Sequence, residues 1–302
     1  MSAATSPVTC KAYGVQRVCG VWSYPRSSFY AHGKPSAAAG PSAAEPLKRG
    51  PKPAWSDKKL LELIKADLED SPFTGEGYRK VWARLKVQGA VRTSPKRVLR
   101  LMRENSLLSP HRARKKDGRA HKGQIITHAP NLMWGTDGSR VFTLEEGWVW
   151  IFVAVDHWNA ECMGWHVCKR GDRFAALEPV SMGLSKHYGS LRAGAARGLA
   201  LRMDHGTQYL SDHFQNQIKY WGIAPSFAFV EQPQTNGVAE RFNRTLKEQA
   251  IYGRVFKNVD ELRKAVGAFV RLYNEQWLVA KLKFKSPCQA REDFYNNDDL
   301  AA

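Results

Sequence analysis

The sequence predicts an α/β fold in which a mixed sheet lies between helical layers, preceded by a small all-helical domain. Two patterns lead to this expectation. From about residue 130 to 273, apolar, β-branched segments alternate with segments of helical period. From residue 56 to 104 only helical periodicity occurs, with breaks at glycine and at Ser-Pro. The change of pattern places the boundary between the two parts near residue 110.

The first part of the chain divides at a linker. Residues 32–53 are rich in Gly, Pro, Ser and Ala, which is typical of a linker. Residues 1–31 are a poorly defined N-terminal segment, and its stretch 9–30 can be the tail of a small helical unit.

Three short helices are expected between residues 54 and 109. Ser56 is a candidate N-cap for the first, Gly77 lies near the start of the second, and Ser94 followed by proline opens the third. The third helix is basic, and we expect three of its cations to point outward and bind DNA, namely Lys96, Arg97 and Arg100. This pattern predicts a helix-turn-helix-like DNA-binding domain. A helical bundle with solvated charges is the structural alternative.

A basic segment, residues 110–128, follows this domain. It contains almost nothing apolar up to residue 123, and its expected DNA contacts are Arg112, Arg114, Lys115 and Lys116. A solvated linker without DNA contacts explains the same composition.

The expected sheet and its helices occupy the rest of the chain. We predict a catalytic core over residues 129–256 and a C-terminal helix and tail over 257–302. Expected strands are 134–142, 149–155, 162–168, 199–203 and 224–230; expected helices are 174–188, 212–221, 237–252 and 258–273. The continuous apolar run of the second strand is typical of a strand covered on both faces.

The charge balance indicates a polyanionic partner. Lys and Arg number 46 against 28 Asp and Glu, which gives a net charge of +18. Such an excess favours nucleic acid, because neutralised phosphates release their counterions, and an anionic membrane surface is the competing partner. No stretch approaches the length of an apolar membrane span, and the five cysteines form no close pair. A cytoplasmic location is therefore expected.

Three acidic residues are placed where a metal site can form. Asp137 lies in the first expected strand between small residues, Asp204 follows the fourth, and Glu240 lies on a helix that Gly237 can start. Carboxylates that converge repel one another unless cations intervene. Mg²⁺ prefers oxygen ligands and is readily shared with phosphates. Two such ions would stabilise the attacking and leaving oxygens of a displacement at phosphorus, and Mn²⁺ can substitute for them.

The helix of Glu240 carries polar and cationic groups at helical spacing. Together with Glu240 these groups make one face suited to a DNA backbone: Asn236, Asn243, Arg244 and Lys247. A second stripe, Val238, Phe242 and Leu246, can pack on the sheet. A solvated amphipathic helix is the structural alternative.

With these residues in view, the chain resembles the insertion-sequence-three family of bacterial transposases, in the larger reading frame that carries the integrase catalytic core. The matching motifs are WGTDGSR, RMDHGTQYLS and QPQTNGVAERFNRTLKEQ, and residues 205–239 between the last two acids give the D-D-35-E spacing of the family. The upstream GYRKVWARLKVQGAVRTSPKRVLRLMRENSL and the downstream LYNEQWLVAKLKFKSPCQAR are also similar to family segments, so the resemblance covers about residues 56–294.

The resemblance implies an RNase H-like fold, with Asp137, Asp204 and Glu240 as metal ligands and catalytic residues. It also implies DNA partners, which are the terminal inverted repeats of the element and a target DNA. A homo-oligomer on DNA is expected, because two ends must be joined, and the product of an upstream smaller reading frame is a further possible partner. The implied location is nucleoid-associated in a bacterial cytoplasm.

Other residues invite a functional interpretation but have bland alternatives. His205, beside Asp204, can contact DNA or simply occupy a turn, and Asp156-His157 can be catalytic or a polar strand end. Two rival functions also stay open, an RNase H-fold nuclease such as a junction resolvase and a catalytically silent DNA-binding regulator. A Ser-His-Asp hydrolase is excluded by the lack of a G-x-S-x-G motif.

Overall fold

The computed structural model describes residues 3–32, 54–87, 89–109, 125–227 and 236–299. The chain forms two compact units, Met1–Pro53 and Ala54–Ala302. The four basic residues expected to contact DNA between residues 110 and 128 (Arg112, Arg114, Lys115 and Lys116) lie outside the described residues. So does the end of the strand expected at 224–230.

The N-terminal unit contains two short helices, α1 (Gly14–Val21) and α2 (Arg26–His32). The first of them buries Cys19. The expected tail of a helical unit is thus a helical pair.

Three helices follow in the second unit: α3 (Asp57–Asp70), α4 (Tyr78–Val87) and α5 (Pro95–Glu104). The predicted cap at Ser56 forms, and Ser94, where the third helix was expected to open, is also an N-cap. The Ser56 hydroxyl accepts a hydrogen bond from the N–H of Lys59, and that of Ser94 accepts one from Arg97. Apolar side chains of the three helices make a common core, led by Leu60, Ile64, Val81, Val98 and Met102. The helical domain predicted from periodicity is therefore present.

One expectation for α5 is wrong in detail. Arg97 does not point freely outward, because its side chain is only 18% exposed and pairs with Asp57 at the start of α3. It also donates to the carbonyl oxygen of Trp55 at 2.6 Å. Arg100 binds the same Asp57 carboxylate, at 2.6 Å, whereas Lys96 is exposed.

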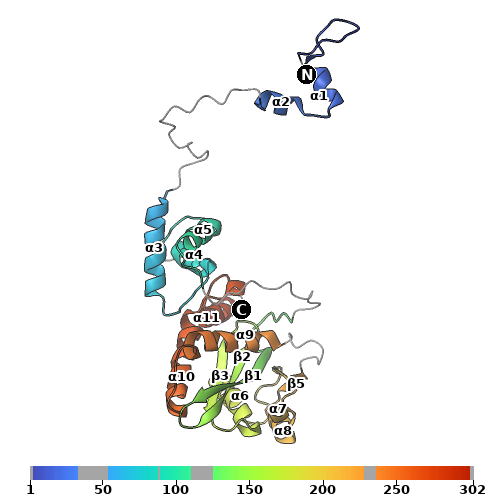
Figure 1. Cartoon of the computed structure of the whole chain (residues 1–302). Helices are drawn as coiled ribbons and strands as arrows, with labels where there is room; N and C mark the ends of the chain where they lie inside the picture. Colours follow the sequence, from blue (N-terminus) through green and yellow to red (C-terminus); the bar gives the residue numbers. More distant parts are fainter. Residues whose placement is uncertain (1–2, 33–53, 88, 110–124, 228–235, 300–302) are drawn as a thin grey trace. The chain divides into compact units, whose positions relative to one another are not determined.

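A five-stranded mixed sheet forms the centre of the second unit (Figure 1). Its strands are β1 (Met133–Thr143), β2 (Gly147–Asp156), β3 (Cys162–Cys168), β4 (Ala200–Met203) and β5 (Ala224–Phe227). The order is β3-β2-β1-β4-β5, with antiparallel pairs on the β3 side of β1 and parallel pairs on the β5 side. This arrangement confirms the predicted RNase H-like α/β class.

Helices cover both faces of the sheet. The helices of one face are α6 (Arg173–Tyr188), α7 (Thr207–Leu210) and α8 (Asp212–Tyr220), which share an apolar core with Trp134, Phe152 and Ala154. The helices of the other face are α9 (Gly237–Leu246), the π-helix η2 (Lys247–Ile251) and α10 (Val259–Gln276), which pack on Val141, Ile151 and Val153. Alternate residues of β1 and β2 thus feed two different cores.

The chain ends with a short 3₁₀ turn, η3 (Ala280–Leu282), and the helix α11 (Pro287–Asp299). Arg291 of α11 is buried, as is Ser286 just before the helix. No helix among the described residues is long and apolar enough to cross a membrane.

Candidate active site

Asp137 lies in the middle of the central strand β1. Its neighbours in the sheet are β2 on one side and β4 on the other. Residues of β1 alternate between the two faces, so that Trp134 packs toward α6 and Asp137 toward α9. The strand therefore presents this carboxylate to the helix that carries Glu240.

Asp204 follows β4 directly, at the end of the strand next to β1. Gly135 pairs with Arg202 in the parallel register, so two further residues along each strand bring the chain to Asp137 and Asp204. The Asp204 side chain is exposed, and its Oδ1 accepts a hydrogen bond of 2.8 Å from the N–H of Gly206. The turn after β4 therefore fixes this second carboxylate beside the first.

Glu240 lies in the first turn of α9, on the solvent side of the helix. The predicted apolar stripe anchors that helix. Phe242 and Leu246 are buried in the core with β1 and β2, and Val238 packs against it. Burial of this stripe leaves Glu240 and Arg244 exposed on the other side.

The three carboxylates interact electrostatically. Burial raises the pKa of Asp137 to about 6, and the charges of Asp204 and Glu240 add to the increase. Hydrogen bonds from Asn243 and from the backbone at Gly138 act in the opposite direction. Burial also raises the pKa of Glu240, with Arg244 lowering it and Asp204 raising it. The charges of Asp204 and Glu240 thus make ionisation of Asp137 more costly.

Two asparagines that were expected on the exposed face of the Glu240 helix are buried. Asn236 and Asn243 were grouped with Glu240 on a DNA-facing surface, but they are only 3% and 5% exposed. Asn236 Nδ2 donates to the carbonyl oxygen of Thr136 at 2.9 Å, and Asn243 Nδ2 donates to Asp137 Oδ2 at 2.7 Å. In this structure both bind strand β1. Arg244 stays exposed, and Lys247 is half-buried in η2.

His205 is exposed next to Asp204, with its ring 5.6 Å from that of Phe227. Thr136, buried beside Asp137, has its hydroxyl 3.4 Å from that of Tyr209 in α7. The turn after β4 is thus attached to the central strand on the face opposite α9.

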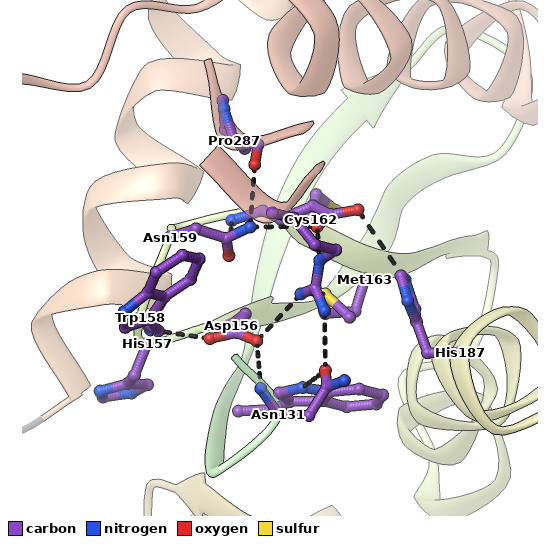
Figure 2. Close-up of polar contacts among 12 residues, drawn as sticks. Asn131, Asp156, His157, Trp158, Asn159, Cys162, Met163, His187 and Pro287 are labelled. Atoms are coloured by element: carbon purple, nitrogen blue, oxygen red, sulfur yellow. Dashed lines mark hydrogen bonds and ion pairs between the residues drawn. The ribbon is translucent and has the colours of Figure 1, made fainter. Parts of the chain in front are cut away.

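Asp156 is part of a buried polar network at the end of β2, and His157 follows it with its imidazole directed away from the network (Figure 2). Asp156 accepts hydrogen bonds from the backbone N–H groups of Asn131 and Trp158 and pairs with Arg291 at 3.0 Å. Arg291 also binds Glu161. Asp156 therefore has a structural role in holding α11, although it is buried and not the solvated polar strand end of the structural alternative. Sequence patterns did not reveal Arg291, because its partners lie more than 120 residues away.

The fit of a metal ion can be judged from the donors present. Among residues 3–32, 54–87, 89–109, 125–227 and 236–299, no three His, Cys, Asp or Glu side chains are already gathered as closely as a closed metal site requires. The three carboxylates nevertheless interact, and the side-chain oxygen of Asn243 is buried without a hydrogen-bond partner. All of these donors are oxygens, the type that Mg²⁺ prefers.

Comparisons with known proteins agree with this architecture. Residues 55–116 match the family model of an HTH-like domain, and residues 127–233 and 221–287 match two models that are both described as an integrase core domain. The chain is 26% identical over 261 residues to the transposase for insertion sequence element IS629 of Shigella sonnei, covering 82% of this chain and 83% of that protein. It is 29% identical over 221 residues to the Escherichia coli transposase InsD for insertion element IS2A/D/F/H/I/K, covering 70% and 71%.

Two solved structures of integrases also align with the chain. The catalytic core domain of HTLV-2 integrase, solved in complex with magnesium, aligns with a TM-score of 0.42 at 17% identity and covers 54% of this chain and 98% of that one. A simian T-cell lymphotropic virus intasome chain aligns with a TM-score of 0.42 at 16% identity, covering 74% and 70%. By its family-model matches, the chain combines an HTH-like domain with an integrase core domain, and its sequence is similar to those of insertion-sequence transposases.

Proposed function

We propose that this protein is a transposase of the insertion-sequence-three type, corresponding to the larger reading frame. It cleaves DNA at the ends of its element and joins those ends to a target by phosphoryl transfer. The proposed catalytic residues are Asp137, Asp204 and Glu240. The observation that carries the proposal is the placement of these three acids: the parallel register of β1 and β4 sets Asp204 beside Asp137, and the hydrogen bond from Asn243 to Asp137 joins the Glu240 helix to the same strand.

The charges of the three acids also support a divalent cofactor. A buried carboxylate whose pKa is raised by two other acids is stabilised when a cation binds between them. When bound, two Mg²⁺ ions would stabilise the attacking and leaving oxygens of the displacement. Asp137, Asp204 and Glu240 would hold them, and Asn243 orients the Asp137 carboxylate through its hydrogen bond to Oδ2.

Two successive displacements account for cleavage and joining. In the first, a water oxygen attacks the phosphorus at the element end and the bond to the 3′ oxygen breaks, which frees a 3′-hydroxyl. In the second, that hydroxyl oxygen attacks a target phosphorus and displaces the target's own 3′ oxygen. Each displacement exchanges one P–O bond for another, so no covalent protein–DNA intermediate is needed.

The proposed DNA contacts come from several elements. Arg244 is exposed one turn after Glu240. Lys247 follows Arg244 by three residues, and the exposed His205 follows Asp204 directly. In the HTH-like domain, Lys96 is exposed on α5. Four residues of the basic segment 110–128 are also proposed to contact DNA phosphates, namely Arg112, Arg114, Lys115 and Lys116. Asn236 and Asn243 are buried and bind strand β1, so their proposed role is to support the site and not to contact DNA.

The assembled form is proposed to be an oligomer on DNA, because joining requires two element ends. The proposed division of labour assigns end recognition to residues 54–109 and chemistry to 129–256. Within the C-terminal part, α10 and α11 pack on the core through the apolar face of α10 and the Arg291 network.

A strand-transfer assay tests the proposal. The full chain is incubated with Mg²⁺, a labelled oligonucleotide of the element's terminal repeat, and plasmid target. Glu240→Gln serves as the matched control, since it keeps the shape of the exposed side chain and removes its charge. Wild-type protein is expected to give joined product that requires Mg²⁺, and the variant should give none.

The rival functions predict other products. Cleavage without joining would indicate a nuclease of the same fold. DNA binding without cleavage by wild-type protein would indicate a regulator. Equal activity of wild type and Glu240→Gln would overturn the proposed site.

A further inference from the structure

Two buried polar atoms face the same glycine of the central strand. A Cβ placed on Gly135 would lie 2.8 Å from Asn236 Oδ1 and 2.9 Å from His157 Nε2. Both atoms belong to the buried side-chain nitrogen and oxygen atoms of the described residues that have no hydrogen-bond partner. Both atoms therefore border the same small space above the Cα of Gly135, where a small side-chain rotation can bring them into direct hydrogen-bonding distance.

The free-energy cost of leaving these two atoms unpaired favours a hydrogen bond between them. A buried polar atom without a partner loses the hydrogen bonds that water would offer it. His157 and Asn236 are 5% and 3% exposed, so water has little access to either. Pairing them removes two penalties at once.

The chemistry of the two groups is complementary. Burial, with the charges of Lys281 and Arg202, lowers the pKa of His157 to about 4, so its imidazole is neutral at pH 7. One nitrogen of a neutral imidazole carries a proton, and with the proton on Nε2 the ring donates. The atom of Asn236 that faces it is the amide oxygen, which accepts, because the amide nitrogen already donates to Thr136.

The backbone holds His157 for this role. Its N–H donates to the carbonyl oxygen of Met133 at 2.9 Å, and its own carbonyl oxygen accepts from Lys281 Nζ at 2.6 Å. The imidazole points away from the Asp156 network (Figure 2). The ring is therefore free of that network and available to Asn236.

We propose that His157 is a positioning residue, whose imidazole donates through Nε2 to Asn236 Oδ1 across Gly135. Asn236 is the N-cap residue of α9, although its side chain makes no capping hydrogen bond. With Thr136 and His157 as its two partners, its amide fastens the start of α9 to β1. We call this attachment of Asn236 to Thr136 and His157 the joint between α9 and β1. The joint sets the distance between Glu240, one turn into the helix, and Asp137, two residues after Gly135. The catalytic consequence rests on the proposed function, whereas the joint itself does not.

Two amide substitutions at residue 157 test this inference. The side-chain nitrogen of His157→Gln reaches about as far as Nε2 and can still donate to Asn236. The shorter side chain of His157→Asn is just as polar but cannot reach. His157→Leu removes the donor altogether. All three are studied in the full chain, with amide hydrogen exchange of residues 237–246 in EDTA and with strand transfer in Mg²⁺.

The expected results separate the Gln variant from the others. Exchange at the start of α9 should accelerate about tenfold in His157→Asn and His157→Leu and stay within about threefold of wild type in His157→Gln. The strand-transfer rate should fall about tenfold in the same two variants with an unchanged Kd for terminal-repeat DNA, since the acids move while the DNA-contacting cations do not.

The exchange measurement keeps this inference separate from the proposed function. If wild-type protein gives no strand transfer, the proposed function is refuted. The exchange rates of the variants still test whether His157 binds Asn236. Equal exchange in the Gln and Asn variants would overturn the joint. A tenfold activity loss in all three, Gln included, would overturn the positioning role.

Discussion

Asn243 Nδ2 donates a 2.7 Å hydrogen bond to Asp137 Oδ2, which links the helix of Glu240 to the strand of Asp137. The bond fixes the carboxylate of a buried acid whose pKa stands near 6. It also leaves the amide oxygen of Asn243 buried beside that carboxylate. The orientation of the central acid thus depends on the helix that delivers another acid.

Removal of this bond should weaken catalysis more than folding. In Asn243→Ala, the carboxylate loses its orienting donor and its pKa should rise further, because that hydrogen bond lowers it. Strand transfer at pH 7 should fall about 10–100-fold, as for other groups that orient metal ligands. Single-turnover kinetics with saturating DNA measures the loss.

The matched control for this variant is Thr245→Ala. Thr245 is another buried polar residue of α9, but its hydroxyl donates to the carbonyl oxygen of Arg241 within the same helix and not to the site. Its loss should leave the strand-transfer rate within about threefold of wild type, since no metal ligand is released. An unchanged rate in Asn243→Ala would show that Asp137 is oriented by other contacts.

The raised pKa of Asp137 predicts a pH dependence of stability in EDTA. Folded protein retains this proton up to about pH 6, whereas the unfolded chain loses it near the ordinary value of 3.8. Between these pH values the unfolded state binds fewer protons, so the free energy of unfolding falls as pH rises through 6. Asp137→Asn should therefore have the higher Tm above pH 6, with the difference disappearing near pH 4. Thermal unfolding from pH 4 to 8 measures it, and added Mg²⁺ should raise the Tm of wild type alone.

Gly135 should tolerate no side chain. The Cβ of Gly135→Ala would lie 2.8 Å from Asn236 Oδ1 and 2.9 Å from His157 Nε2, so the joint at the start of α9 must open. We expect a loss of about 1–3 kcal/mol of unfolding free energy. Gly237→Ala is the matched control, because its Cβ would meet nothing within 4 Å. Urea denaturation of the two variants checks the difference, and equal stability would contradict the tight contact.

Much of the site could be predicted from the sequence because it depends on local patterns. Apolar strands, a glycine turn after Asp204 and an amphipathic helix around Glu240 each have a periodicity of their own. Their convergence needed one further fact, the parallel register of β1 and β4. The sequence of neither strand alone predicts that register.

The failures have a common physical cause, which is contact between distant segments. A helical wheel places Asn243 near Glu240, but only the sheet decides which of the two is covered. The helix expected to run to residue 252 becomes a π-helix after Leu246. Leu246 and Ile251, five residues apart, both enter the same core, which a π turn permits and a 3.6-residue period does not.

Arg291 should be essential for stability. Its guanidinium pairs with Asp156 and Glu161, both buried, so Arg291→Met removes the ion-pair partner of Asp156 and leaves Glu161 with Lys186 as its remaining cation. Loss of one partner of a buried ion pair costs about 3–5 kcal/mol. Lys285→Met is the control, because Lys285 and Asp293 form an exposed pair expected to contribute less than about 1 kcal/mol. Equal effects in chemical denaturation would show that the Arg291 network contributes little.

Neighbouring cations of α5 should respond differently to substitution. Lys96 is exposed and free to meet phosphate, whereas Arg97 is held by Asp57 and the carbonyl oxygen of Trp55. Lys96→Ala should weaken DNA binding and reduce the slope of log Kd against log salt by about one. Arg97→Ala should instead lower the Tm, because Asp57 loses one of its two arginine partners at the start of α3. Salt titrations of terminal-repeat binding and thermal unfolding distinguish the two. A larger salt effect from Arg97 than from Lys96 would mean that DNA displaces the Asp57 pair, so that α3 and α5 separate at their ends when DNA binds.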